Sequence, residues 1–388
     1  MKLVFVSGNR GWGGSEELWS ATAAVLAADG HRVAVFKSVV DDSRPRMRRL
    51  RALGCPIRDL ARFPLMPRGL FTLVRLLSSN AAYGHEVLRL LLGLVLTRRP
   101  DLVVVSQGGN HDGFPFAEVC RRLRLPYAIV SQKASELYWP EDWQQKTIAA
   151  VYRAARATFF VSEHNRRLTG EQLGFPLPRA AVVHNPFLVP WEPRTDWPDD
   201  RHEVRLACVG RLHPKEKGQD LLLRVLARRR WRERPLSITF YGDGLQRASL
   251  ERMSRILGLT KVVFAGFVGD VPAIWSNHHG LILPSRCEGM PLVLVEAMLS
   301  GRVPIVTDVG GNAEVVVDGT TGYIAAAPTE DALDDAMERA WNERHRWREI
   351  GGAAAAHIRT LIPREPERCF AKRLVELASS ASDRNSHA

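Results

Sequence analysis

The sequence predicts an α/β protein of two domains, each built on a parallel β-sheet. The chain has 388 residues, which is enough for two domains of ordinary size. Short apolar runs alternate with longer segments of helical period along almost the whole chain, a pattern typical of βαβ units. A proline-rich stretch, residues 185–198, separates the two halves. The simplest architecture is two Rossmann-like domains that face one another across a cleft.

The predicted strands are short apolar runs, five in each half. They cover residues 3–7, 32–36, 102–106, 127–131 and 158–161, then 204–209, 237–241, 262–264, 280–284 and 303–307. The prolines between the halves disfavour helix and strand and favour a stiff linker. We therefore predict an N-terminal domain at residues 1–190 and a C-terminal domain at 203–365. Residues 367–374 have the pattern of one more amphipathic helix.

Charge is distributed unevenly between the predicted domains. The chain has 54 Lys and Arg against 42 Asp and Glu, a formal net charge of +12. Residues 1–190 contain 26 basic and 15 acidic residues, so nearly all of the excess lies in the first half. This uneven distribution favours an anionic partner for the N-terminal domain. We predict no nucleic-acid partner, because no aromatic-and-basic repeat or known nucleic-acid motif accompanies the charge.

The sequence predicts a reducing compartment and no membrane-spanning helix. Five scattered cysteines without C-x-x-C spacing support neither a disulfide framework nor a zinc site. The apolar run after Met1 is too short for a signal peptide, and residues 87–96 are too short to cross a bilayer. We expect a cytoplasmic protein, with peripheral attachment to the inner face of the membrane as a further hypothesis. Residues 63–71, with Arg75 and Arg89, mix apolar and basic side chains, as a segment that lies at a membrane interface would. The alternative is an ordinary core helix after a loop.

Three segments carry residues suited to an anionic ligand. The first strand ends in a glycine-rich turn, residues 8–14, which either lets backbone N–H groups approach an anion or only makes a tight turn. In the second half, residues 210–220 follow a strand and contain Arg211 and Lys217, whose side chains suit phosphate oxygens. Side chains placed there lie where open α/β sheets bind ligands, whereas a solvated basic turn is the alternative.

The most specific segment is residues 285–298. Pro291 suits the first turn of a helix, and the N–H groups of Gly289, Met290 and Leu292 would then be unpaired donors for an anion. Glu288 precedes this helix. Glu296 lies inside an otherwise apolar run, where a carboxylate needs hydrogen-bond donors such as vicinal hydroxyls. The alternative is a core glutamate whose partners belong to the protein.

Together these motifs resemble the family 4 retaining glycosyltransferases (glycosyl transferases group 1), which have the GT-B fold. The likeness runs nearly end to end. Glu288 and Glu296, with seven residues between them, are its strongest landmark. The other landmarks are the glycine-rich first loop, Gly210-Arg211 with Lys217-Gly218, Gly242-Asp243-Gly244, Val263-Phe264-Ala265-Gly266, Val309-Gly310-Gly311 with Glu314, and Asp318-Gly319 with Gly322.

The resemblance implies a role for each matching residue. Arg211 and Lys217 would bind the diphosphate of a nucleotide-sugar donor and stabilise it as leaving group, and Glu296 would hold the ribose hydroxyls. The remaining donor-binding residues would be Glu288, Gly289, Met290 and Leu292 at the sugar and phosphate, Gly13 and Gly14 from the other domain, and Phe267 and Val268 at the base. The resemblance also implies that the final helix, about residues 366–380, packs on the N-terminal domain.

Two positions depart from the family pattern. Lys217 is six residues beyond Arg211, one more than many members show, so Lys215 competes for its role. The family often has a histidine after the fourth strand. Here His111 is the catalytic candidate, although it is offset from that position by a few residues. The alternative is that His111 is a solvated loop histidine. Lys133 stands where members often have another histidine, which favours an unusual acceptor side.

The resulting prediction is a retaining, metal-independent glycosyltransferase of hexosyltransferase type. It would move a sugar from a nucleotide-diphosphate sugar to a hydroxyl acceptor, a glycan or lipid-linked intermediate of cell-surface polysaccharide synthesis. Preorganised cations and helix N–H groups would stabilise the departing diphosphate. No Asp-x-Asp sequence occurs, so we predict neither a bound metal nor another cofactor. The alternative is a GT-B-type sugar-nucleotide epimerase or phosphorylase.

Overall fold

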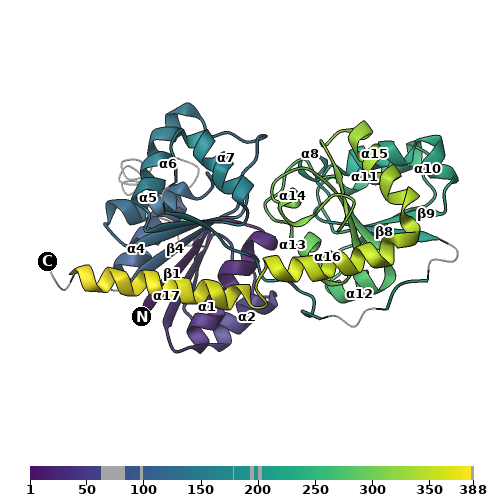
Figure 1. Cartoon of the computed structure of the whole chain (residues 1–388). Coiled ribbons are helices and arrows are strands. Elements are labelled where there is room, and N and C mark those ends of the chain that lie inside the picture. The colour runs from purple at the N-terminus through teal and green to yellow at the C-terminus, as the bar shows by residue number, and fades with distance from the viewer. Residues whose placement is uncertain (63–83, 97–98, 178, 193–195, 200–202, 386–388) are drawn as a thin grey trace. The chain divides into compact units, whose positions relative to one another are not determined.

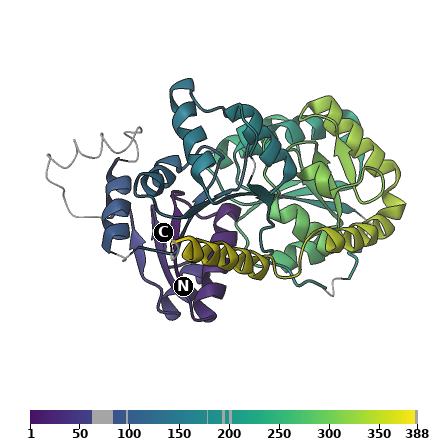
Figure 2. The ribbon, with the colours of Figure 1, turned by 60° about the vertical axis from the view of Figure 1, so that its left-hand side comes forward.

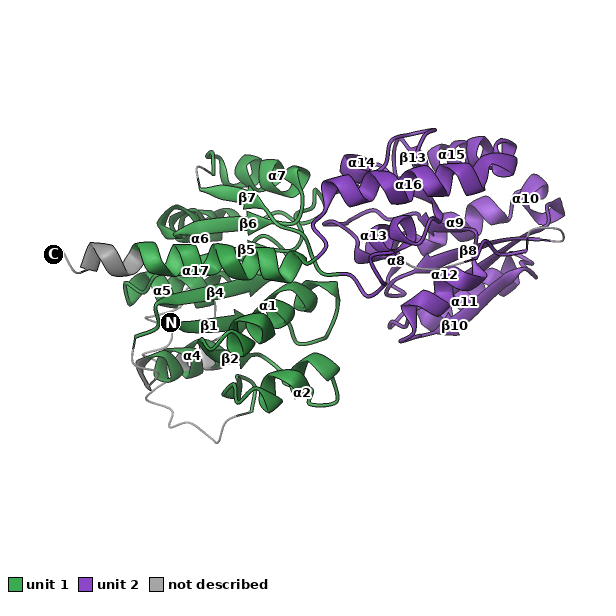
Figure 3. Ribbon diagram, turned by 60° about the horizontal axis from the view of Figure 1, so that its bottom comes forward, with its two compact units in different colours: residues 1–186, 365–388 green, residues 187–364 purple. Residues whose placement is uncertain are grey.

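The computed structural model describes the chain except residues 63–83, 97–98, 178, 193–195, 200–202 and 386–388. Two compact units are present: unit 1 contains Met1–Pro186 and Glu365–Ala388, and unit 2 contains Phe187–Arg364 (Figure 3). The hypothesised interfacial segment, residues 63–71 with Arg75, lies outside the described residues. Arg89 is described, and its guanidinium donates a hydrogen bond to the Leu60 carbonyl.

Unit 1 is built on a seven-stranded sheet in which every described pairing is parallel. In spatial order the strands are β3 (Ile57–Asp59), β2 (Arg32–Lys37), β1 (Lys2–Ser7), β4 (Leu102–Gln107), β5 (Tyr127–Ser131), β6 (Ala157–Phe160) and β7 (Ala180–Val182). All six residues of β4 are buried, because helices cover both faces of a parallel sheet. The order reverses between β1 and β4, so connections leave these two strands in opposite directions.

Two groups of helices cover this sheet. One face packs against α1 (Glu17–Ala28), α2 (Pro45–Ala52) and α17 (Pro366–Asn385), and the other against α4 (Gly84–Leu96), α5 (Phe114–Arg122), α6 (Asp142–Ala154) and α7 (Glu163–Leu173). Nine of the twelve residues of α1 are buried because α1 packs both on the sheet and against α17, which lies beside it on the same face (Figures 1 and 2). The Phe370 ring of α17 meets Phe159 of β6 edge-on, with ring centroids 5.0 Å apart. The α17 helix ends at Asn385, beyond the expected end near residue 380.

Unit 2 contains a second parallel sheet of six strands. In spatial order they are β10 (Val262–Gly266), β9 (Leu236–Tyr241), β8 (Val204–Val209), β11 (Gly280–Leu283), β12 (Val303–Thr307) and β13 (Tyr323–Ala325). All ten predicted strands are present in the two sheets. The order reverses between β8 and β11, which places the segments after these strands at a topological switch point.

The helices of unit 2 continue the alternation of strand and helix. They are α8 (Pro214–Lys217), α9 (Gln219–Leu226), α10 (Arg229–Glu233), α11 (Arg247–Ile256), α12 (Val271–Asn277), α13 (Leu292–Leu299), α14 (Asn312–Val315), α15 (Glu330–Asn342) and α16 (Trp347–Leu361). The main apolar core joins α9, α10, α11 and α15 to the sheet. Within the described part of the chain, no helix is both long enough and apolar enough to cross a membrane.

Candidate active site

The candidate site of unit 2 lies where β8 and β11 end. These strands are neighbours in the sheet, and the segment after β8 leads into α8 while the segment after β11 leads into α13. Gly218 ends α8 with φ of +63°, and a Cβ built there would lie 1.8 Å from the Pro284 carbonyl oxygen. Only glycine permits this close approach, which brings the two segments together.

Lys217 and Glu288 form an ion pair at this junction. The Lys217 Nζ lies 2.7 and 2.8 Å from the two carboxylate oxygens of Glu288. The Ser285 hydroxyl donates to Glu288 Oε1 at 2.7 Å, and the Glu288 side chain is 6% exposed. The structure therefore brings two predicted site residues into direct contact. Sequence reasoning missed this pairing and also missed Ser285.

Arg211 lies on the same segment but is more accessible. Its side chain is 69% exposed, and its guanidinium reaches Glu216 Oε2 at 3.3 Å. The Arg211 backbone carbonyl accepts a hydrogen bond of 2.7 Å from the Gln219 side chain, which fixes the backbone rather than the side chain. Arg211 can reorient toward an anion if it gives up its long contact with Glu216.

A bidentate ion pair braces the two segments. Arg286 donates to Asp220 Oδ1 at 2.7 Å and to Oδ2 at 2.9 Å, and it also donates to the Pro214 carbonyl. Burial alone would raise the pKa of the Asp220 carboxyl, but the hydrogen bonds and charge of Arg286 outweigh burial and lower that pKa. Sequence reasoning missed this brace, which links α9 to the segment after β11.

Asp220→Asn should therefore destabilise the protein in a pH-dependent way. A carboxyl with a lowered folded-state pKa adds stability above its unfolded pKa and loses it as the pH falls through the folded value. We expect a loss of about 1–2 kcal/mol at neutral pH. The loss should be unchanged at about pH 5 and smaller below about pH 4. Urea unfolding of both proteins across this range measures it, and a gap that grows in acid would contradict the assignment.

The start of α13 has a geometry suited to anion binding. Pro291 precedes the helix as its N-cap, one position earlier than the predicted place in the first turn. The N–H groups of Leu292 and Val293 lie in the first turn, where no helical carbonyl pairs with them. Gly310, with φ of +56°, lies so close to Glu288 that a Cβ would be 2.4 Å from the Glu288 carbonyl oxygen. The Gly311 N–H donates to the Gly289 carbonyl at 2.7 Å, which fixes the loop before the helix.

Glu296 and Phe267 have different surroundings. Glu296 is 4% exposed, and its Oε1 accepts a hydrogen bond of 2.9 Å from the Leu188 backbone N–H. Glu296, which the sequence predicts to bind the ribose, therefore also holds the backbone of the segment that begins unit 2. Phe267 follows β10 and is 70% exposed, while its N–H donates to Asp243. Val268 beside it is half-buried, and Met290 is buried near α13.

The predicted site residues of unit 1 lie near the ends of β1 and β4. Gly13 and Gly14 are exposed, and Gly13 has extended backbone with nothing within 4 Å of a built Cβ. Neither the backbone nor the packing of the chain therefore requires glycine at position 13. His111 is half-buried in the turn after β4, and its Nδ1 lies 3.1 Å from Asn110 Oδ1. Lys133 lies over the Tyr138 ring, 5.5 Å from its centroid.

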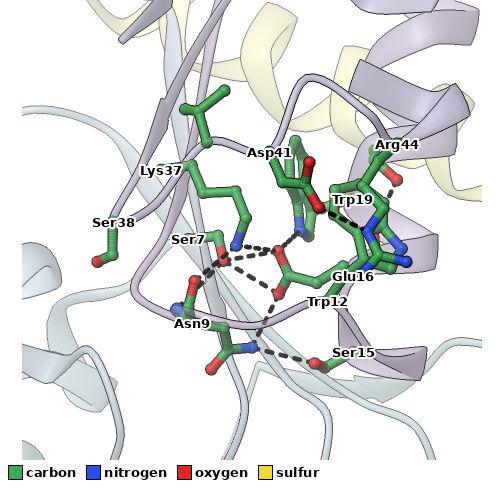
Figure 4. Close-up of polar contacts among 12 residues, drawn as sticks. Ser7, Asn9, Trp12, Ser15, Glu16, Trp19, Lys37, Ser38, Asp41 and Arg44 are labelled. Atoms are coloured by element: carbon green, nitrogen blue, oxygen red, sulfur yellow. Dashed lines mark hydrogen bonds and ion pairs between the residues drawn. The ribbon is translucent and has the colours of Figure 1, made fainter. Parts of the chain in front are cut away.

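A buried ion pair fixes the glycine-rich loop of unit 1, and sequence reasoning missed it. Lys37 Nζ at the end of β2 lies 2.8 Å from Glu16 Oε2, and both side chains are at most 1% exposed. The Glu16 carboxylate also accepts hydrogen bonds from Ser7, Asn9 and Trp19, as Figure 4 shows. Lys37 donates to the Asn9 carbonyl at 2.5 Å, so the pair holds the backbone where the loop begins.

Metal-ligating side chains do not gather in the described residues. Across the ranges that the structure describes, no group of three or more His, Cys, Asp or Glu could hold a metal ion.

Two family models match this chain in consecutive segments. The model described as Glycosyl transferase 4-like domain matches residues 13–186, and the one described as Glycosyl transferases group 1 matches residues 203–343. Together they cover most of both units.

Curated relatives carry glycosyltransferase names. The GDP-mannose-dependent alpha-(1-6)-phosphatidylinositol monomannoside mannosyltransferase of Mycolicibacterium smegmatis is 32% identical over 243 residues, which cover 56% of this chain and 62% of that protein. The alpha-D-kanosaminyltransferase of Streptomyces kanamyceticus is 33% identical over 144 residues, 36% of each chain. The chain thus spans less than two thirds of the length of these relatives.

Solved structures match over nearly the full length. Anabaena HepE in complex with UDP and glucose has a TM-score of 0.76 and 19% identity, and the match covers 98% of this chain and 100% of that one. A glycosyltransferase from Rickettsia africae has a TM-score of 0.73 at 12% identity, with 98% of each chain covered. At these identities the likeness concerns the fold, which is GT-B. By its two family models and its fold, the chain belongs to the group 1 glycosyltransferases.

Proposed function

We propose that this protein transfers a sugar from a nucleotide-diphosphate sugar to a hydroxyl acceptor with retention of anomeric configuration. The observation that best supports this proposal is the Lys217–Glu288 ion pair at the topological switch point of unit 2, on the segments that also contain Arg211 and the first turn of α13. Cations and free N–H groups in such a place suit a diphosphate. The names of the relatives support transfer rather than epimerisation or phosphorolysis, so we do not propose those alternatives.

In the proposed reaction, the bond between the sugar C1 and the diphosphate oxygen breaks and its electron pair goes to the diphosphate. Arg211, Lys217 and the N–H groups before and within the first turn of α13 stabilise this growing charge. Glu288 orients Lys217 through its two carboxylate contacts. The acceptor oxygen forms the new bond to C1 on the same face and releases its proton to the departing oxygen. Comparison of the anomeric configuration of donor and product by NMR tests retention, and an inverted product would refute it.

Glu296 is proposed to bind the ribose of the donor. Its burial and its acceptance of the Leu188 N–H hold the carboxylate in one position. Hydrogen bonds to a charged group contribute about 1.5–3 kcal/mol each. Glu296→Gln should therefore weaken binding of the nucleoside diphosphate by about 10-fold to 100-fold, because an amide cannot accept with both of its polar atoms.

Titration calorimetry with ribose and 2′-deoxyribose forms of the diphosphate isolates this contact. The wild-type protein should prefer the ribose form, whereas Glu296→Gln should bind the two forms about equally. If the variant keeps the full wild-type preference, Glu296 does not hold the ribose hydroxyls. Since one relative is named for GDP-mannose and one neighbour is bound to UDP, both bases belong in the titration.

We further propose that the acceptor is a glycan or a lipid-linked intermediate and that unit 1 meets an anionic membrane surface. Nearly all of the chain's excess positive charge lies in residues 1–190, and the mycobacterial relative is named for a phosphatidylinositol mannoside. Binding to vesicles should rise with the fraction of anionic lipid and fall with salt. Co-sedimentation that is independent of anionic lipid would contradict the membrane part of this proposal.

A further inference from the structure

The amino ends of β1 and β2 in unit 1 border a cavity of about 520 Å³. Residues 2–4, 31–34 and 53–56 line it, together with Ala27 of α1 and Pro100 before β4. Its volume is within the range of small-molecule sites. The six residues of β1 separate it from the glycine-rich loop by roughly 20 Å, at about 3.3 Å per residue. A ligand in this cavity therefore lies away from the candidate active site and is not one of the reactants.

The lining of this cavity is mostly aliphatic. Among the thirteen residues that line it, eight are Leu, Val, Ala or Pro, and none is Ser, Thr, Asn, Gln, Asp or Glu. Leu53, at the end of α2, is 38% exposed although its side chain is large and apolar. A sugar or a nucleobase placed here would leave hydroxyl or amide groups without partners, which is costly. The lining therefore suits an aliphatic body that displaces water from Leu53 and its neighbours.

Three basic side chains, those of Lys2, His31 and Arg32, line the same cavity. Lys2 of β1 and Arg32 of β2 are register partners in the parallel pairing, so their side chains leave the same face of the sheet beside one another. Like charges in such positions repel. Arg32 is exposed, and no ion pair within the described part of the chain involves it. An anion beside these two cations would offset the repulsion and give the Arg32 guanidinium a partner.

The acidic residues near these cations lie outside the lining. Asp101 Oδ2 accepts a hydrogen bond of 2.7 Å from the Lys2 backbone N–H. Asp29, in the turn after α1, lies 3.8 Å from the Arg368 guanidinium of α17. The charged residues of the lining are therefore all basic, which favours a ligand with a negative charge.

From this lining we infer that the cavity binds an aliphatic chain with one anionic head group, a carboxylate or a phosphate. The chain lies against the apolar residues of the lining, Leu53 among them, and the head group pairs with Lys2 and Arg32. A free fatty acid and a membrane lipid share this chemistry. The inference goes beyond the sugar transfer proposed above and does not depend on it.

Binding of matched small probes tests the ligand class. The probes are octanoate, hexanoate, octyl phosphate, 1-octanol, acetate and inorganic phosphate, at concentrations that form no micelles. Saturation-transfer NMR should show contact with the chain protons of octanoate and octyl phosphate. Octanoate should bind about 10-fold more tightly than hexanoate, because it buries two more CH₂ groups. It should also bind about 10-fold more tightly than 1-octanol, which lacks the charge. Acetate and inorganic phosphate should not displace octanoate.

Two variants separate the chain from the head group. Arg32→Gln should weaken octanoate binding by about 10-fold and leave 1-octanol binding unchanged. Leu53→Asp should weaken the binding of both, because it replaces an apolar side chain of the lining with a carboxylate. The matched controls are Arg48→Gln, at an exposed position of α2, and Leu92→Asp in α4, where Leu92 is 41% exposed. Neither control residue lines the cavity, so both controls should bind octanoate as the wild-type protein does.

Absence of octanoate contact in the wild-type protein, or wild-type affinity in both Arg32→Gln and Leu53→Asp, overturns the inference. Displacement of octanoate by acetate or inorganic phosphate also overturns it, because the chain would then add nothing to binding. Circular dichroism shows whether each variant is folded, and nucleoside-diphosphate binding reports separately on the donor site of unit 2. Displacement of octanoate by phosphatidylglycerol vesicles would identify a membrane lipid as the source of the chain, whereas retention of octanoate would identify a free acid.

Discussion

Lys217→Met should lower kcat/KM for sugar transfer by about 10²-fold to 10³-fold, the range found when one donor to a developing negative charge is removed. Methionine keeps the aliphatic stem and removes the ammonium that lies 2.7 Å from Glu288. Two effects then add. The departing diphosphate loses a cation, and the buried Glu288 carboxylate loses the ammonium group that contacts both of its oxygens. Since the proposed mechanism gives Lys217 the place that a metal would otherwise take, it predicts that the wild-type rate also survives EDTA. Steady-state kinetics with each substrate varied measures the effect.

The matched control is Lys215→Met. Lys215 is exposed, lies two positions earlier in the same helix, and was the competing choice from sequence spacing. The same loss of charge at this position should change kcat/KM by less than about 10-fold, since an exposed charge is screened by solvent. Equal losses in the two variants, or a larger loss at Lys215, would show that the wrong lysine has been assigned.

Lys37→Met should destabilise unit 1 by about 3–5 kcal/mol, because it leaves an uncompensated buried charge. The Glu16 carboxylate would keep the hydrogen bonds from Ser7, Asn9 and Trp19 but lose the only cation that contacts it among the described ion pairs. The Asn9 carbonyl would lose its donor as well, so the glycine-rich loop would loosen.

The double variant Glu16→Gln/Lys37→Met provides the control for this pair. Removal of both charges should cost less than Lys37→Met alone, because no charge is then left buried without a partner. Urea unfolding followed by circular dichroism gives the comparison through the transition midpoints. A double variant less stable than either single variant would mean that packing, rather than charge pairing, dominates at this position.

Much of the fold was predictable because the central strands are buried on both faces. Residues 102–106 and 127–131 are continuous apolar or small runs, which stand out in a sequence. The strands that escaped prediction are β3, β7 and β13. Each has three residues and lies at an edge of its sheet, and β3 and β7 contain no buried residue. Edge strands of this length carry too little apolar pattern to be recognised.

The candidate site was predictable in its residues but not in its pairings. Local sequence identified Arg211, Lys217, Glu288 and Glu296, because each lies in a segment that follows a strand or begins a helix. The Lys217–Glu288 contact joins residues 71 positions apart, and the Glu16–Lys37 contact joins the residue before α1 to the end of β2. Only the fold brings these groups together. A charged residue at the end of a buried strand, such as Lys37, needs a partner of opposite charge. This was the one signal in the sequence that could have indicated the Glu16–Lys37 pair.

The most direct test of the central claim is a thermal-unfolding screen against nucleoside diphosphates in the presence of EDTA. In the proposed donor site the diphosphate lies on Arg211, Lys217 and the start of α13. At a hundred times its Kd, one diphosphate should therefore stabilise the folded protein by about 2.7 kcal/mol and raise Tm by about 5–10 °C. The shift should be lost in Lys217→Met and kept in Lys215→Met. No shift with any diphosphate at millimolar concentration, or an equal shift in Lys217→Met, would contradict the account.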